Sequence, residues 1–226
     1  MSDLRTRVFI IDDHPFVREW LANLLELEAD FIIAGQSDDP VTALSAMTAN
    51  PPDIAVVDLT LKKGSGLELV KGLRSQAPAV GIVILSMHDE VTDVERAFRA
   101  GATAYVMKHE STSQIVEAIR HARAGRIFAN PAMLAHLTAR LMNRTDHESA
   151  RPDHVLSDRE LEVFRRMGSG QSTRAIADHL GVSLKTVQTY CARIKEKLGL
   201  QNAQELARAA FRWLENRQTD RPFNKL

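Results

Sequence analysis

The stretch Val8-Phe9-Ile10-Ile11-Asp12-Asp13 places two carboxylates directly after four consecutive apolar residues. A short run of this kind, rich in β-branched side chains, is typical of a strand that is buried on both faces of a sheet. Similar apolar runs follow at residues 31–34, 54–57, 82–85 and 104–107. Together the runs predict five strands, of which the first ends in a pair of acidic side chains.

Longer segments between these runs carry apolar residues at the i, i+3 and i+4 spacing of helices that cover a core. The apolar positions are Phe16, Trp20, Leu21, Leu24 and Leu25 in the first segment, Leu67, Val70 and Leu73 in a later one, and Ile115, Ile119 and Ala122 in the last. Strands that alternate with helices favour a parallel sheet with helices on both faces. We therefore expect residues 1–125 to form an α/β domain with flavodoxin-like winding, five parallel strands and five helices.

The pattern changes after Gly125, and the rest of the chain is expected to be helical. The helix-start signal Asn130-Pro131 precedes a tether helix at 132–142, and a polar stretch without periodicity follows it. Ser157 and Glu160 have the spacing of a capping box at the start of the next helix. Later helices are predicted at 173–180, 184–198 and 201–214, the first two capped by Ser172 and Ser183 and ended by Gly181 and Gly199. The predicted parts are a linker at 126–154, an all-α domain at 155–217 and a disordered tail at 218–226.

The charge of the chain is divided unevenly, although its formal net value is +0. Residues 1–125 hold 12 of the 29 Lys and Arg and 18 of the 29 Asp and Glu, a net charge of −6. The remaining residues hold 17 against 11, a net charge of +6. The first part therefore suits a cation or a basic partner, and the second suits a polyanion.

Several classes of protein are excluded by composition. No apolar run approaches the roughly 20 residues that span a bilayer, and the polar start at 1–7 predicts no signal peptide. Cys191 is the single cysteine, so an internal disulfide is excluded, and no Cys/His cluster has zinc-site spacing. These features predict a cytoplasmic protein that does not bind membranes.

Polar residues that end the predicted strands converge on one edge of the sheet, because ligands of open parallel sheets bind at the carboxyl ends of strands. These residues are Asp12, Asp13, Asp58, Ser86 and Lys108. Three carboxylates repel one another unless a counter-charge is present, and a hard divalent cation, Mg²⁺ or Mn²⁺, is the natural one. Lys108 adds a second positive charge and Ser86 a hydroxyl donor. Such a set suits phosphoryl transfer to a carboxylate.

This first part of the chain resembles the receiver domain of two-component response regulators. The matching stretches are Phe9-Ile-Ile-Asp-Asp-His14, Val56-Val-Asp-Leu-Thr60, Val83-Ile-Leu-Ser86 and Gly101-Ala-Thr-Ala-Tyr-Val-Met-Lys108. The resemblance implies that Asp58 accepts phosphate from a sensor histidine kinase. It also implies that Asp12 or Asp13, Asp58 and the backbone carbonyl of Thr60 hold the metal ion.

In the same family, the serine turns towards the phosphoryl group and an aromatic side chain follows, which rearranges the face of the fourth helix, fifth strand and fifth helix. Here these switch residues are Ser86 and Tyr105, although Tyr105 alternatively serves plain edge packing. One departure concerns Lys108: the family usually has a cis-proline soon afterwards, whereas here His109-Glu110-Ser111 follow. We expect a trans peptide there. The neighbouring basic residues His14, Lys62, Lys63 and His88 are expected on the surface or a kinase-docking rim.

The predicted helices 173–180 and 184–198, joined by Gly181-Val182, have the pattern of a helix-turn-helix. Their exposed face carries side chains that read base edges or reach phosphates, namely Lys185, Thr186, Gln188, Thr189, Ala192 and Arg193. The helix start at Ser183 offers free amides to a phosphate, and Lys195 and Lys197 add positive charge. Cys191 is expected to be a small buried residue and not a redox sensor.

Residues 155–214 resemble the four-helix LuxR/NarL-type effector domain through Leu156-Ser-Asp-Arg-Glu-Leu-Glu-Val163, Ser172-Thr-Arg-Ala-Ile-Ala177 and Val182-Ser-Leu-Lys-Thr-Val-Gln-Thr-Tyr190. The family often has an Asn-His pair or a basic residue where this chain has Thr189-Tyr190 and Ala192, which implies fewer or shifted DNA contacts. The resemblance implies that the last helix forms a dimer on two DNA half-sites, through Gln201, Leu206 and Ala210.

Together the two halves predict a NarL/FixJ-type response regulator, a transcription factor that is switched by phosphorylation of Asp58. Its expected partners are a histidine kinase, double-stranded DNA and a second copy of the chain, with RNA polymerase as a further candidate. Its own chemistry would be limited to self-phosphorylation from phosphodonors and autodephosphorylation. The alternatives are a phosphorylation-independent factor whose receiver only dimerises, a phosphatase and a ligand-sensing regulator. The phosphatase is disfavoured because Thr60 stands where such enzymes commonly carry a general acid.

Overall fold

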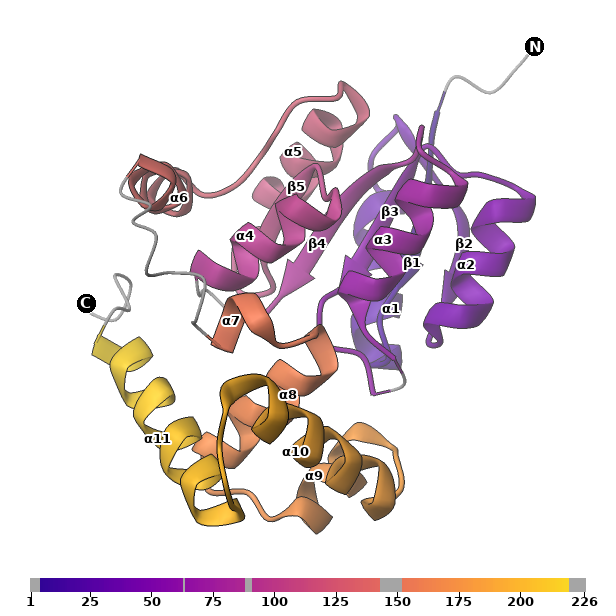
Figure 1. The fold of residues 1–226 in the computed structure, drawn as a ribbon. Coiled ribbons are helices and arrows are strands. Elements are labelled where there is room, and N and C mark those ends of the chain that lie inside the picture. Colours follow the sequence, from indigo (N-terminus) through magenta and orange to yellow (C-terminus); the bar gives the residue numbers. More distant parts are fainter. Residues whose placement is uncertain (1–4, 63, 88–90, 143–151, 220–226) are drawn as a thin grey trace. The chain divides into compact units, whose positions relative to one another are not determined.

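A computed structural model describes residues 5–62, 64–87, 91–142 and 152–219 of the chain. The chain divides into two compact units, Met1–Arg140 and Leu141–Leu226, and Figure 1 shows the elements of each.

The first unit is built on a five-stranded parallel sheet with the order β2-β1-β3-β4-β5. The strands are β1 (Thr6–Ile11), β2 (Phe31–Ser37), β3 (Ile54–Asp58), β4 (Gly81–Ser86) and β5 (Ala104–Met107). This order is the flavodoxin-like winding that the sequence predicts. The apolar runs form the strands because nearly every side chain of β1, β3, β4 and β5 is buried.

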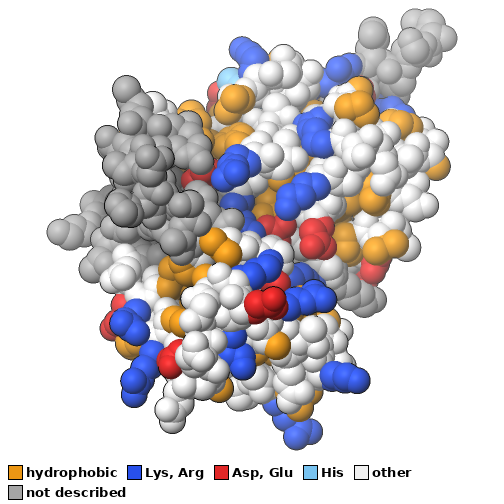
Figure 2. Space-filling model, in the orientation of Figure 1, with side chains coloured by type: hydrophobic (Ala, Val, Ile, Leu, Met, Phe, Trp, Pro, Cys, Tyr) orange, Lys and Arg blue, Asp and Glu red, His pale blue; other side chains and the backbone are white. Residues whose placement is uncertain are grey.

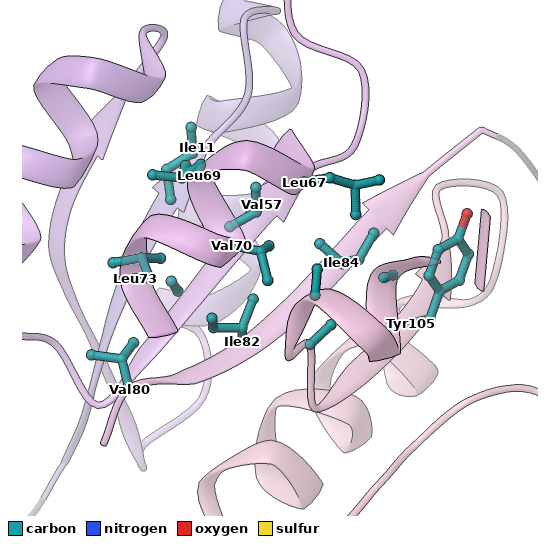
Figure 3. Close-up of a cluster of buried hydrophobic side chains, with 14 of the residues drawn as sticks. Ile11, Val57, Leu67, Leu69, Val70, Leu73, Val80, Ile82, Ile84 and Tyr105 are labelled. Atoms are coloured by element: carbon teal, nitrogen blue, oxygen red, sulfur yellow. The ribbon is translucent and has the colours of Figure 1, made fainter. Parts of the chain in front are cut away.

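Helices cover both faces of this sheet and enclose two hydrophobic cores. The helices are α1 (Pro15–Glu26), α2 (Pro40–Ala49), α3 (Gly66–Gln76), α4 (Val91–Ala100) and α5 (Thr112–Arg123). Helices α2, α3 and α4 pack on one face, where Val57, Val70 and Ile84 belong to a cluster that Figure 3 shows. Helices α1 and α5 pack on the other face. The predicted α/β architecture is confirmed.

The segment after α5 returns to the sheet and lies along its β5 edge. Phe128 forms a parallel bridge with Ala104, and α6 (Pro131–Met142) follows. Ala129 and Met133 are buried in the same cluster as the α3 and α4 side chains. The predicted tether helix therefore forms, but the beginning of the expected linker at 126–154 packs on the first unit. Residues 143–151 of that linker lie outside the described residues.

The second unit is helical and encloses a core of its own. Its elements are α7 (Pro152–Val155), α8 (Asp158–Gly168), α9 (Thr173–Leu180), α10 (Leu184–Leu198) and α11 (Ala203–Thr219). The capping box predicted for Ser157 and Glu160 is present, and Ser172 and Ser183 cap α9 and α10. The left-handed conformations of Gly181 and Gly199 end α9 and α10, because only glycine adopts them without strain.

Two boundaries of the second unit differ from the predicted ones. Pro152–Val155 forms the short helix α7 inside the expected linker. The last helix begins at Ala203 rather than at residue 201, because the Oδ1 atom of Asn202 accepts a hydrogen bond from the Glu205 amide at 2.9 Å. It also extends beyond residue 214, through Thr219. The expected disordered tail at 218–226 therefore starts as helix, and residues 220–226 lie outside the described residues.

Candidate functional site

An acidic pocket lies at the carboxyl ends of β1, β3 and β5. Asp12 and Asp58 are buried, and Nζ of Lys108 reaches both, at 2.6 Å from Asp12 Oδ2 and 2.9 Å from Asp58 Oδ2. The strand register places Asp58 beside Leu85 of β4. The three residues lie 46 to 96 positions apart in sequence, and the parallel sheet brings them within hydrogen-bond distance. The predicted convergence of Asp12, Asp58 and Lys108 is thus observed.

The backbone around Asp58 holds its carboxylate in place. The amide of Thr60 donates a hydrogen bond to Asp58 Oδ1 at 3.1 Å, and the amide of Leu59 donates to the Leu85 carbonyl at 3.2 Å. A Cβ atom on Gly66 would overlap the carbonyl oxygen of Asp58, so the first turn of α3 approaches the site only with glycine there. These contacts leave Asp58 Oδ2 directed at Lys108.

Burial and charge change the acidity of the pocket. Burial raises the pKa of Asp58 to about 6, and Asp12 adds to the rise, while Lys108 and the Thr60 amide oppose it. Burial by itself would lower the pKa of Lys108, but the neighbouring Asp58 and Asp12 raise it overall. Lys108 therefore stays protonated, and the ionised form of Asp58 carries an uncompensated electrostatic cost.

The donor set of the pocket fits a hard divalent cation. One ligand atom from each of Asp12, Asp13, His14 and Asp58 lies within 4.8 Å of the others. The Asp13 side chain is 6% exposed, and its buried Oδ1 atom lacks a hydrogen bond of good geometry, although His14 Nδ1 lies 2.9 Å away. Bound Mg²⁺ or Mn²⁺ would stabilise three carboxylates held this close together, one of which has a buried oxygen without a well-aligned donor. The Thr60 backbone contributes its amide to Asp58, and its carbonyl stays a predicted ligand.

The basic residues near the pocket differ in their positions. His14 is exposed, as expected, and its Nδ1 lies 3.2 Å from Asp12 Oδ1. Lys62 is on the surface, with its amide 3.2 Å and its Nζ 3.4 Å from Asp13 Oδ2. Lys63 and His88 lie outside the described residues.

The two predicted switch residues are fully buried. Ser86 ends β4 and lies beside Met107 of β5 in the strand register, and the Lys108 amide donates to its carbonyl at 2.8 Å. Tyr105 has no exposed surface, and Figure 3 shows it at one side of the apolar cluster. This position agrees with tight packing, and the switch roles of Ser86 and Tyr105 stay predictions.

The turn after Lys108 has no cis peptide, as expected, and none occurs in the described residues. The sequence does not predict how this turn is held in the absence of the family's proline. The Glu110 amide donates to the Met107 carbonyl at 3.0 Å, and Glu110 Oε2 accepts from the Met107 amide at 3.3 Å. A glutamate at this position carries no familiar signal, because its partner depends on how the turn folds.

A helix-turn-helix occupies the second unit, where α9 and α10 pack through Ala177, Leu180, Val187 and Ile194. The side chains predicted for its reading face are mostly exposed, with Thr186 partly covered: Lys185, Thr186, Gln188, Thr189, Ala192 and Arg193. Ser183 Oγ accepts from the Thr186 amide at 3.1 Å, and the Thr189 hydroxyl donates to the Lys185 carbonyl at 3.0 Å. Lys and Arg side chains are spread over the visible face of this unit (Figure 2).

Two of the predicted dimer residues need correction, and Lys197 has a contact that the sequence does not predict. Lys197 Nζ donates to Glu160 Oε2 at 2.6 Å, so its charge ties α10 to the buried start of α8, whereas Lys195 is half-buried. Leu206 and Ala210 are 1% and 0% exposed and pack inside the unit's own core. A dimer through α11 would have to use its exposed residues instead, as Gln201 just before it is exposed.

Cys191 is half-buried, and its Sγ lies 3.7 Å from Met167 Sδ. Burial raises the pKa of the Cys191 thiol, which keeps it in the less reactive protonated form. The expected packing role agrees with this environment.

The fold and the pocket define a receiver domain joined to a helix-turn-helix effector. The family described as "Response regulator receiver domain" matches residues 8–120, and "Bacterial regulatory proteins, luxR family" matches residues 154–210. The chain is 32% identical to the Probable transcriptional regulatory protein NarL of Mycobacterium tuberculosis, over 92% of this chain and 94% of that one. It is 30% identical to the Oxygen regulatory protein NreC of Staphylococcus carnosus, over 91% and 97%. The chain therefore belongs to the NarL/FixJ family of two-component response regulators, whose relatives here are transcriptional regulatory proteins.

Solved structures agree with this assignment. A two-component response regulator of the LuxR family from Aurantimonas sp. SI85-9A1 is 31% identical, with a TM-score of 0.58 over 62% of this chain and 99% of that one. The RcsB response regulator of Salmonella typhimurium shares the fold, with a TM-score of 0.63 at 21% identity over 96% and 98%. Among the helices of the described ranges, none combines the length and apolar character needed to cross a membrane.

Proposed function

We propose that Asp58 accepts a phosphoryl group from a sensor histidine kinase, and that this modification switches DNA binding by the second unit. The contact of Lys108 Nζ with both Asp58 and Asp12, at 2.9 and 2.6 Å, carries the proposal. A buried lysine held between two buried carboxylates at the carboxyl edge of the sheet provides a nucleophile and a cation for a phosphoryl oxygen.

Each residue of the pocket has a separate task in this proposal. Asp58 Oδ2, which lies beside Lys108, attacks phosphorus, and the P–N bond of the kinase phosphohistidine breaks to release the imidazole, while the Thr60 amide holds Oδ1. Lys108 then exchanges its contact with Asp58 for one with a phosphoryl oxygen, and the Ser86 hydroxyl supplies a second donor. Mg²⁺ or Mn²⁺, held by Asp12, Asp13, Asp58 and the Thr60 carbonyl, would neutralise the charge that develops on the transferring group.

The proposed output is binding of double-stranded DNA by α10. Lys185, Gln188 and Arg193 present exposed donors on one helix that is capped by Ser183, the arrangement that enters a major groove. Solved structures of RcsB include two dimers bound to two DNAs, and we propose that this chain likewise binds two half-sites as a dimer. We also propose that the protein acts in the cytoplasm and that RNA polymerase is a further partner.

Phosphate uptake and DNA affinity, measured on the same preparations, test this function. Wild-type protein incubated with acetyl phosphate and Mg²⁺ is expected to gain one phosphoryl group by intact mass, and its affinity for promoter DNA is expected to rise. Asp58→Asn should gain neither. Asp30→Asn is the matched control, because Asp30 is an exposed aspartate that precedes β2 at the opposite edge of the sheet.

The outcomes separate the rival functions. If acetyl phosphate left the DNA affinity of both wild type and Asp58→Asn unchanged, the result would favour a transcription factor whose receiver only dimerises. Sustained multiple turnover of a phosphate ester would favour a phosphatase. Either result would overturn the proposal that phosphorylation of Asp58 is the switch.

A further inference from the structure

The turn that carries Lys108 is closed by Glu110, two residues after the lysine. Glu110 contacts Met107 twice, through its amide at 3.0 Å from the Met107 carbonyl and through Oε2 at 3.3 Å from the Met107 amide. Lys108 lies between these two residues, so the hydrogen bonds of Glu110 fix the backbone from which the Lys108 side chain extends to Asp58.

The other oxygen of Glu110 contacts the start of α6. Oε1 accepts a hydrogen bond from Asn130 Nδ2 at 3.3 Å. Asn130 uses its own Oδ1 to cap α6, accepting from the Ala132 amide at 2.9 Å. These two contacts fix which end of the Asn130 amide is the donor. One carboxylate therefore joins the Lys108 turn to the helix that leads out of the first unit.

Backbone hydrogen bonds hold the segment that Asn130 belongs to along β5. The Tyr105 amide donates to the Phe128 carbonyl at 2.9 Å, and the Phe128 amide donates to the Thr103 carbonyl at 3.2 Å. Ala129 and Met133 are buried in the cluster that contains Tyr105. Residues 126–134 thus cover the β5 edge, and the Glu110–Asn130 hydrogen bond links them to the turn that carries Lys108. We call this hydrogen bond the tie.

We propose that Glu110 is a positioning residue for the phosphorylation of Asp58, and that its hydrogen bond to Asn130 couples the position of Lys108 to the docking of residues 126–134 on β5. This inference rests on the proposed function of Asp58. When Lys108 moves towards a phosphoryl oxygen, the turn that Glu110 closes moves with it. The shift reaches α6 through Asn130, without a change in the strands that hold Asp12 and Asp58.

Two single variants break this tie while they keep the local structure on either side. In Asn130→Asp, one carboxylate oxygen still caps α6, because Asp is as good a helix cap as Asn, but the other faces the Glu110 carboxylate and repels it. In Glu110→Gln, one oxygen still accepts from the Met107 amide, but the new amide group faces the Asn130 amide, donor against donor.

The double variant Glu110→Gln with Asn130→Asp restores the tie in reverse. The Gln amide donates to the free Asp oxygen, while its own oxygen accepts from Met107, so every donor again has an acceptor. A double-variant cycle therefore separates the coupling from the separate effects of the two substitutions.

Amide hydrogen exchange of Tyr105 and Phe128 in phosphate-free protein measures the docking. We expect exchange to quicken between about twofold and tenfold in each single variant, the range for the loss of one hydrogen bond, and to return to within about twofold of wild type in the double variant. The rate of phosphorylation by acetyl phosphate with Mg²⁺ measures the positioning. It should fall several-fold in both single variants and recover in the double variant.

Failure of the double variant to recover would overturn the tie. Exchange that recovers while phosphorylation rates stay equal in all four proteins would overturn the positioning role, because a merely structural contact would give that result. A wild-type chain that takes up no phosphate would refute the proposed function of Asp58 and the positioning role with it, while the exchange measurements would still decide whether Glu110 holds α6.

Discussion

The replacement of Asp58 by asparagine should stabilise the first unit when no divalent cation is present. The physical reason is the burial that raises the pKa of Asp58, helped by the nearby Asp12. An asparagine keeps the shape and can still accept from the Thr60 amide, but it carries no charge. The substitution therefore removes an electrostatic cost and leaves Lys108 paired with Asp12.

The magnitude and its pH dependence follow from the pKa values. The pKa of Asp58 rises from 3.8 to about 6 in the folded chain, and about 1.4 kcal/mol per pKa unit gives a cost of about 3 kcal/mol. Below about pH 3 the group is protonated in both folded and unfolded chains, so the cost is near zero. Between about pH 3 and 7 the unfolded chain ionises first and stability is lost, and above about pH 7 the cost is complete.

Urea unfolding in EDTA, followed by Trp20 fluorescence in a Trp213→Phe background, measures this cost in the first unit. The stability gained by Asp58→Asn should grow from near zero at about pH 3 to about 3 kcal/mol at about pH 7.5. Asp30→Asn should show the opposite sign, because the hydrogen bond from Arg120 lowers the pKa of Asp30 and its stabilisation is lost as the pH falls. Adding Mg²⁺ should reduce the difference in stability between Asp58→Asn and wild type, because the cation stabilises only the wild-type pocket. A gain that is the same at every pH would refute the electrostatic reasoning.

Further outcomes test the second unit. Lys197→Met should lower the free energy of unfolding of the second unit by about 2 kcal/mol, because Glu160 is left buried without that cation. Lys185→Met is the matched variant: it should leave urea unfolding unchanged and reduce the salt slope of DNA binding by about one. Gly168→Ala should cost about 1–3 kcal/mol of stability in the same assay, because its Cβ would lie 2.6 Å from the Ala210 carbonyl oxygen; an unchanged midpoint would contradict the close approach of α8 and α11. Gln188→Ala should weaken promoter binding in fluorescence anisotropy while phosphate uptake stays at the wild-type level. A loss of phosphate uptake would contradict the independence of the phosphorylation pocket and the DNA-binding face.

The features that could be predicted from the sequence are those that chain topology alone determines. Residues that end buried parallel strands must meet at one edge of the sheet, so Asp12, Asp58 and Lys108 could be brought together without knowledge of any side-chain conformation. Helix caps such as Ser157 and Ser183 depend on bonds within one turn, so the local sequence is enough to predict them.

The sequence alone could not assign apolar faces and long side chains, because their partners depend on packing between elements. Leu206 and Ala210 are one turn apart on α11, and this spacing fits a dimer interface as well as a core. The structure shows the core, because α8 approaches α11 closely at Gly168. Lys197 has the position of a DNA contact in sequence, and only the fold reveals the buried carboxylate of Glu160 beside it.

The geometry of the pocket bears on how a signal leaves it. A phosphoryl group adds about −1.5 to −2 of charge to a site where Lys108 already contacts two buried carboxylates, so a bound divalent cation is needed for the modified state to be stable. Asp12 and Asp58 belong to strand ends that are fixed by the sheet register, and they have little freedom to respond. Lys108 follows the last residue of β5 and lies in a turn closed by Glu110. The added charge therefore acts most readily on Lys108, and movement of its turn would reach α6 through Asn130 before it disturbed the sheet.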